Sequence, residues 1–154
     1  MPNSSFPMTD AGFIVDRTSN TIRLTRNLAV PPETVFSAWT RPEHVTCWWD
    51  PTGAPLTTCE IDLRPGGAFK FVTQSHSEAP FEGVYREISP PNLLIFSALG
   101  AIGRVIMQEE QQGTRLTVEI ECASREHLEQ FLKMGVADGT AQTLDNLVGY
   151  ASSL

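Results

Sequence analysis

The last thirty residues constrain the fold most strongly, because they carry the one long helical pattern in a chain otherwise patterned as strands. Ser124 is a typical N-cap residue. Gly135 and Gly139 interrupt the pattern, and a glycine inside a helix costs about 1 kcal/mol relative to alanine. We therefore expect one long helix from 124 to 154, with a bend or a close approach by another group at the glycines. The residues that recur at helical spacing on its apolar face are Leu128, Phe131, Leu132, Ala137, Ala141, Leu144, Leu147, Val148 and Ala151.

Upstream of this helix, alternating segments separated by turn residues predict antiparallel strands. Prolines at helix starts predict two short helices over 31–41 and 42–48. The sequence therefore predicts an α+β fold, in which a curved antiparallel sheet of about six or seven strands packs around the long C-terminal helix, with two short helices after the first strand. The expected strands span 21–29, 56–62, 68–74, 81–88, 93–98, 102–109 and 114–122, with a further edge strand at 13–15.

The chain has 154 residues, a length that favours one domain. We place this domain at 21–154. Residues 1–20 form an N-terminal extension that is loose or contributes a short edge strand, because its start is rich in Ser, Pro, Asn and Thr.

The net charge of −7 and the pI of about 4.9 argue against nucleic acid or an anionic membrane as a partner. The N-terminus lacks the pattern of a signal peptide, and no segment approaches the roughly 18 apolar residues of a membrane span. The three cysteines are far apart and form no CxxC pair. We therefore expect free thiols and a cytoplasmic location.

A sheet of this length twists and curls, and one helix about 10 Å across does not fill its concave face. We therefore expect a cavity between helix and sheet, lined by apolar and aromatic side chains. Tyr85 is the polar group that we favour as a ligand contact, since a buried phenol needs a partner. The ligand-binding residues predicted on this basis are Trp39, Trp49, Phe69, Phe71, Phe81, Tyr85, Phe96, Ile106, Phe131 and Met134.

Motifs for catalysis are not apparent. His44, His76 and His127 are scattered, and no His, Cys, Asp or Glu grouping has metal-ligand spacing. The sequence contains no GxSxG motif and no glycine-rich phosphate loop before a helix. We therefore assign no catalytic residue, no metal and no cofactor. An enzyme that uses Tyr85, His44 or a carboxylate as its acid or base stays open as an alternative.

Five blocks taken in order resemble the activator of 90-kDa heat-shock-protein ATPase homologue family, within the START-like (SRPBCC) helix-grip superfamily. The resemblance covers about 21–154 and implies a helix-grip fold with an internal pocket, as in the birch pollen allergen. Thr140 follows Gly139 where the family usually has tryptophan, which implies a larger or more polar pocket. The blocks are Val30–His44, Trp48–Gly53, Glu60–Gly67, Gly83–Pro91 and Leu144–Leu147.

The blocks also have physical interpretations. The run from Asp62 to Gly67 is typical of a tight turn, in which Arg64 bonds nearby carbonyls or a carboxylate. In the Trp48–Trp49 pair, we expect one buried ring and one ring near the pocket mouth.

The favoured function is the binding of a small hydrophobic or aromatic molecule in the internal cavity. Two alternatives stay open: a cyclase- or hydrolase-like enzyme acting in that cavity, and a protein-interaction module of the chaperone-cofactor type. A homodimer and a chaperone are accordingly open as partners.

Overall fold

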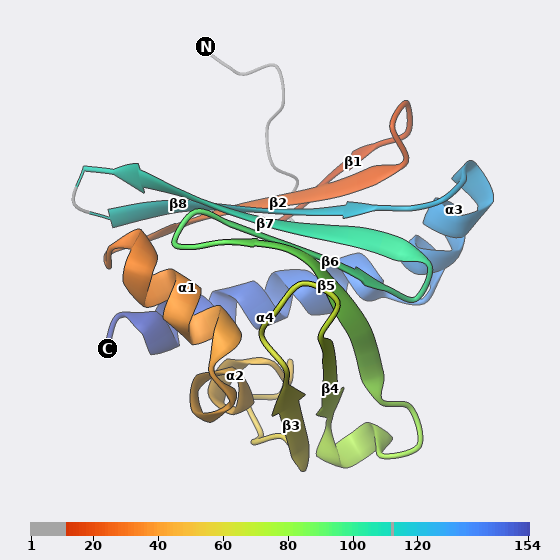
Figure 1. Cartoon of the computed structure of the whole chain (residues 1–154). Coiled ribbons are helices and arrows are strands. Elements are labelled where there is room, and N and C mark those ends of the chain that lie inside the picture. Colours follow the sequence, from red (N-terminus) through yellow and green to blue (C-terminus); the bar gives the residue numbers. More distant parts are fainter. Residues whose placement is uncertain (1–11, 112) are drawn as a thin grey trace.

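The structure is a computed structural model that describes residues 12–111 and 113–154. An eight-stranded antiparallel sheet curves around the C-terminal helix (Figure 1). Its strand order is β1-β2-β8-β7-β6-β5-β4-β3. The strands are β1 (Ile14–Asp16), β2 (Thr21–Leu28), β3 (Thr58–Ile61), β4 (Ala68–Val72), β5 (Phe81–Ser89), β6 (Leu93–Ala98), β7 (Ala101–Glu110) and β8 (Gly113–Glu121).

The predicted fold class is confirmed, although the sheet has eight described strands where the sequence predicted about six or seven. The eighth strand is β1, which lies where the sequence predicted a further edge strand at 13–15 and pairs with β2 through Val15 opposite Ile22. The structure thereby gives part of the expected N-terminal extension a place in the sheet. The remainder of the expected loose segment, residues 1–11, lies outside the described residues.

The curvature of the sheet has an identifiable local source. The register between β5 and β6 shifts between Tyr85 and Glu87, which is a β-bulge. A bulge bends its strand and increases the local twist. The second half of β5 consequently turns away from β3 and β4. In the view of Figure 1, these two strands lie below the rest of the sheet.

Two short helices, α1 (Pro32–Thr40) and α2 (Pro42–Trp48), lie at one end of the concave face (Figure 1). Each begins with a proline in its first turn, where the missing N–H has no intrahelical partner to lose. Trp48 is fully buried, and its indole Nε1–H donates to the Ala38 carbonyl at 3.0 Å. This bond connects the end of α2 to α1.

The expected long C-terminal helix is divided into α3 (Arg125–Lys133) and α4 (Val136–Ala151). The division occurs at Gly135, whose φ of 80° lies in the left-handed region that glycine adopts without strain. Ser124 caps α3, because its hydroxyl accepts the His127 N–H at 3.1 Å. Gly139 does not break the helix and lies within α4.

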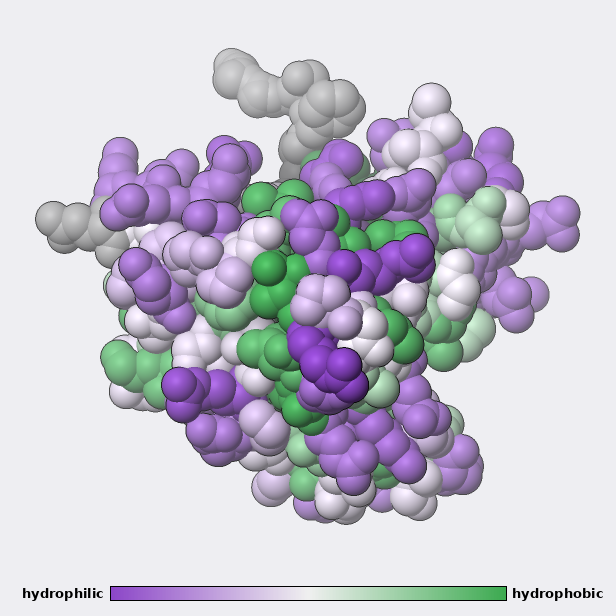
Figure 2. Space-filling model, viewed as in Figure 1, coloured by the Kyte–Doolittle hydropathy of each residue, from purple (hydrophilic) through white to green (hydrophobic). Residues whose placement is uncertain are grey.

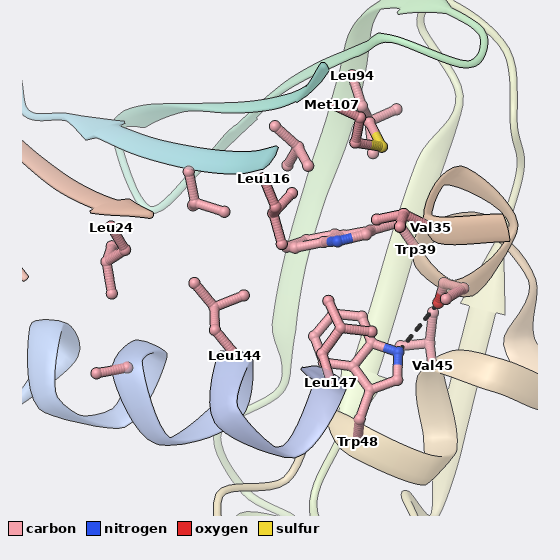
Figure 3. Close-up of a cluster of buried hydrophobic side chains, with 14 of the residues drawn as sticks. Leu24, Val35, Trp39, Val45, Trp48, Leu94, Met107, Leu116, Leu144 and Leu147 are labelled. Carbon is pink, nitrogen blue, oxygen red and sulfur yellow. Dashed lines mark hydrogen bonds between the residues drawn. The ribbon is translucent and has the colours of Figure 1, made fainter. Parts of the chain in front are cut away.

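The core lies between the sheet and α4. Leu144 and Leu147 on α4 are at most 1% exposed. Both point from the helix into the core, Leu144 toward Leu24 and Leu116 of the sheet (Figure 3). On the face shown in Figure 2, hydrophobic residues gather at the centre and hydrophilic residues surround them. Within the described residues, no helix is long and apolar enough to cross a membrane.

Candidate functional site

A cavity of about 270 Å³ lies between the sheet and the N-terminal half of α4. It reaches the surface beside the β6–β7 turn, because the lining residue Leu99 is 57% exposed. Its lining residues are Trp39, Trp49, Pro51, Phe81, Phe96, Ala98, Leu99, Ala101, Gly103, Val118, Ile120, Phe131, Gly135, Val136, Gly139, Thr140, Thr143 and Leu144.

Five of the ten residues predicted from the sequence line this cavity, and each comes from a different helix or strand or from its end. Trp49 follows α2, and its ring centre lies 5.2 Å from that of Phe81 and 6.4 Å from that of Trp39. These spacings suit edge-to-face and offset aromatic contact. The five are Trp39, Trp49, Phe81, Phe96 and Phe131.

Phe69, Phe71 and Tyr85 pack one layer farther from α4. They border a separate space of about 10 Å³, which is at the limit for a single water molecule. The Phe69 ring centre lies 5.6 Å from that of Phe81 and 5.1 Å from that of Tyr85. These three residues therefore support the aromatic wall from behind and do not line the main cavity.

Ile106 and Met134 lie away from the cavity. Along β7, residues 101, 103, 105 and 107 are buried, so strand alternation places Ile106 on the outer face with Arg104. Met134 follows the last residue of α3 and is 64% exposed. The charged Arg104, two residues before Ile106, was the sequence signal for the outer face.

Tyr85 differs from its expected role. The side chain is 3% exposed and does not line the main cavity. Burial, followed by the charge of a Cys59 thiolate, raises the pKa of the Tyr85 phenol above its usual value. A phenol with a raised pKa, outside the main cavity, is a poor acid or base for a ligand held there.

Small residues on α4 leave the space open. A Cβ atom built on Gly139 meets no other atom within 4 Å. Across the cavity, Gly103 allows the Phe96 ring to lie against β7, since a Cβ there would fall 2.4 Å from Phe96 Cζ. The position opposite Phe96 in the β6–β7 register is indeed Gly103. Sequence reasoning missed this pair, because only the register brings the two residues together.

Two threonines are the hydroxyl-bearing residues of the lining. The Thr140 hydroxyl donates to the Val136 carbonyl at 2.7 Å. The Thr143 hydroxyl donates to the Gly139 carbonyl at 2.8 Å and lies 3.1 Å from the Trp49 carbonyl. Trp39 contributes a buried indole Nε1–H that has no hydrogen-bond partner among the described residues.

The Trp48–Trp49 pair matches its predicted arrangement, with Trp48 buried and Trp49 lining the cavity. Arg64 donates to the Asp62 carboxylate at 2.9 Å and stabilises the turn before β4, as the turn interpretation expected.

His44 contacts the Tyr150 hydroxyl through Nδ1 at 2.6 Å, outside the cavity lining. Among the described residues, no cluster of His, Cys, Asp or Glu has the arrangement of a metal site.

The curved sheet, the break before α4 and the cavity between them agree with what a comparison of sequences shows. The family model described as "Activator of Hsp90 ATPase homolog 1-like protein" matches residues 29–152. The chain belongs to this family. The match confirms the family indicated by the five sequence blocks and includes the whole cavity lining. No curated protein is similar enough to the chain to count as a match.

Solved structures share the fold. A protein from Nitrosomonas europaea is 26% identical, with a TM-score of 0.78, over 86% of this chain and 94% of that one. A protein from Mycobacterium smegmatis is 22% identical, with a TM-score of 0.77, over 96% and 99% of the two chains. A protein from Rhodobacter sphaeroides is 21% identical, with a TM-score of 0.76, over 87% and 93%.

Proposed function

We propose that the chain binds one small apolar or aromatic molecule in the cavity between the sheet and α4. The observation that carries this proposal is the cavity of about 270 Å³. Protein interiors are packed as densely as organic crystals, and voids larger than a water molecule are few. Space of this size lowers stability relative to filled packing. A bound molecule would supply the missing contacts.

Size and shape indicate the class of molecule. An apolar cavity of about 150 Å³ holds benzene, so about 270 Å³ has room for a molecule with two fused rings. The five aromatic rings of the lining offer faces and edges for stacking, which is worth about 0.5–1.5 kcal/mol per aromatic pair beyond area burial.

The chemistry of the lining supports binding over catalysis. General acid–base catalysis needs an ionisable group within hydrogen-bond reach of the substrate. The described residues that line the cavity include no Asp, Glu, His, Cys, Lys or Arg. His44, the other acid or base considered from the sequence, is paired with Tyr150 outside this lining.

A chaperone-interaction role is the second candidate function, and the description of the family model favours it. Leu99 and Met134 are large exposed side chains, at 57% and 64% exposure. Leu99 lines the cavity, and Met134 precedes the lining residue Gly135 in the chain. If this role is correct, the chain raises the ATPase rate of a 90-kDa heat-shock protein and a Leu99→Ser/Met134→Ser variant does not. An unchanged rate with the wild-type chain contradicts the role.

The binding proposal is tested with naphthalene as the probe. We expect a saturable, one-to-one change in tryptophan fluorescence, because Trp39 and Trp49 line the cavity. Gly139→Leu should abolish the change, since its side chain projects into open space in the cavity. Gly149→Leu is the matched control, because Gly149 is an exposed glycine on the same helix outside the lining. Equal binding by Gly139→Leu, or none by the wild type, contradicts the proposal.

A further inference from the structure

We infer that the cavity selects an uncharged molecule that carries a hydroxyl group, and that Thr140 on α4 accepts the hydrogen bond from this hydroxyl. The inference rests on the proposed function and specifies the ligand of the same cavity. It follows from which hydrogen-bond donors and acceptors the lining still has available.

The direction of the hydrogen bond follows from the bonds the threonines already make. A threonine hydroxyl has one hydrogen to donate and two lone pairs to accept with. Thr140 commits its hydrogen to the Val136 carbonyl at 2.7 Å, and Thr143 commits its hydrogen to the Gly139 carbonyl at 2.8 Å. Both hydroxyls can therefore only accept from a ligand. Thr143 is buried, at 7% exposure, whereas Thr140 is half-buried. Thr140 is therefore the more accessible acceptor for a ligand.

The absence of charge follows from the rest of the described lining. No cation in it could neutralise a ligand carboxylate or phosphate, and no anion could neutralise an ammonium group. A charge buried without a partner is strongly disfavoured. The net charge of −7 further disfavours an anionic ligand at long range.

The tryptophan donors do not reverse this selection. Trp39 Nε1–H is buried without a hydrogen-bond partner among the described residues. The Trp39 ring packs edge-to-face against the Trp48 ring, with the ring centres 4.8 Å apart. An indole N–H is also neutral and compensates no charge. A ligand hydroxyl keeps lone pairs that can accept from such a group while it donates to Thr140.

The experiment compares three ligands of one shape by calorimetry: 2-methylnaphthalene, 2-naphthol and 2-naphthoate. We expect 2-naphthol to bind about 2- to 12-fold more tightly than 2-methylnaphthalene, which corresponds to one net hydrogen bond. We expect 2-naphthoate to bind at least about 100-fold more weakly than 2-naphthol, because its charge must lose water without a partner. A fourth ligand, 2-methoxynaphthalene, accepts but does not donate, so it should bind more weakly than 2-naphthol.

Variants locate the acceptor. Thr140→Val keeps the shape of the side chain and removes its oxygen. The affinity of 2-naphthol should therefore fall to about that of 2-methylnaphthalene, while the affinity of 2-methylnaphthalene stays as in the wild type. Thr117→Val is the matched control, since Thr117 lies on β8 outside the lining. Circular dichroism checks that each variant is folded, and the comparison of ligands on the wild-type chain holds independently of the variants.

The outcomes separate the two proposals. If 2-methylnaphthalene binds but 2-naphthol gains nothing, or if the gain persists in Thr140→Val, the inference is wrong and the binding function stands. Tight binding of 2-naphthoate also overturns the inference. If neither neutral ligand binds, the proposed function itself fails.

Discussion

At the scale of single residues, adjacent side chains serve different parts of the structure. Trp48 is fully buried and joins α2 to the Ala38 carbonyl of α1, whereas Trp49 lines the cavity. The two ring centres are 5.7 Å apart. A helix end allows this separation, because Trp48 is the last residue of α2 and Trp49 is its C-cap. One residue therefore stabilises the cavity wall while the next forms its surface.

The three cysteines offer a second residue-scale contrast, and we predict their order of reactivity. Cys47 is exposed, Cys59 is half-buried and Cys122 is buried. Burial, followed by the charge of Glu43, raises the pKa of the Cys59 thiol to about 11. Because the thiolate is the reactive form, one thiol should react rapidly with a disulfide reagent at pH 8 and Cys47→Ser should remove that phase. A rapid phase that survives in Cys47→Ser contradicts the assignment.

The same pKa shift predicts a dependence of stability on pH. The folded-state pKa of Cys59 is raised from 9.0 to about 11, so between these values the folded chain retains a proton that the unfolded chain loses. Stability contributed by this group is therefore fully present below pH 9 and declines as pH rises toward 11. Urea unfolding should show a shallower decline over this interval in Cys59→Ala than in the wild type. An identical slope would show that Cys59 does not contribute.

At the scale of elements, α4 combines two kinds of surface. Its second half presents Leu144 and Leu147 to the sheet (Figure 3), and its first half presents Gly139 and Thr140 to the cavity. Large side chains fill the space between layers where they occur, and small ones leave it open. The change in residue size along one helix therefore determines where the cavity lies.

This arrangement predicts that replacing Gly139 stabilises the fold. Leucine has a higher helix propensity than glycine by about 0.8 kcal/mol, and a Cβ at position 139 meets no atom within 4 Å. We expect Gly139→Leu to raise the free energy of unfolding by about 1–2 kcal/mol, through propensity and new burial. In Gly149→Leu, the free energy of unfolding should rise only by the contribution of helix propensity. Urea unfolding measures both, and a loss of stability in Gly139→Leu alone would show that the cavity cannot accept the side chain.

At the scale of the whole molecule, the cavity lies between the sheet and the C-terminal helix, so its occupancy is coupled to global unfolding. A ligand that binds only the folded chain stabilises it by about 2.7 kcal/mol at 100 times its dissociation constant. For a chain of this size, that corresponds to a rise in Tm of about 5–10 °C. Thermal unfolding with increasing 2-naphthol should show this rise in the wild type and in Gly149→Leu, but not in Gly139→Leu. The same shift in all three proteins would place the ligand elsewhere.

Much of the architecture was predictable because it depends on local rules. Alternating apolar and polar residues predicted a strand at 114–122, and β8 spans Gly113–Glu121 with Leu116 and Val118 buried. Proline and serine signals predicted the starts of α1, α2 and α3. The family blocks then indicated the helix-grip fold, which the structure and the family match confirm.

The lining of the cavity was only half predictable. An aromatic residue on an inward-facing position belongs either to the cavity surface or to the layer behind it, and periodicity does not distinguish the two. Phe81 lines the cavity while Phe69, also inward-facing on the next strand, lies behind it. The division at Gly135 also required the structure, because glycine spacing alone indicated a bend without its exact residue.

The sequence by itself determined the order of the elements and the family, because side-chain period and turn chemistry act over a few residues. Only the tertiary structure decided that the sheet and α4 leave about 270 Å³ between them, and that Gly139 and Thr140 border this space. The distance between two layers depends on the bulge in β5, the break before α4 and the packing of rings from distant segments. None of these is encoded in the pattern of one segment alone.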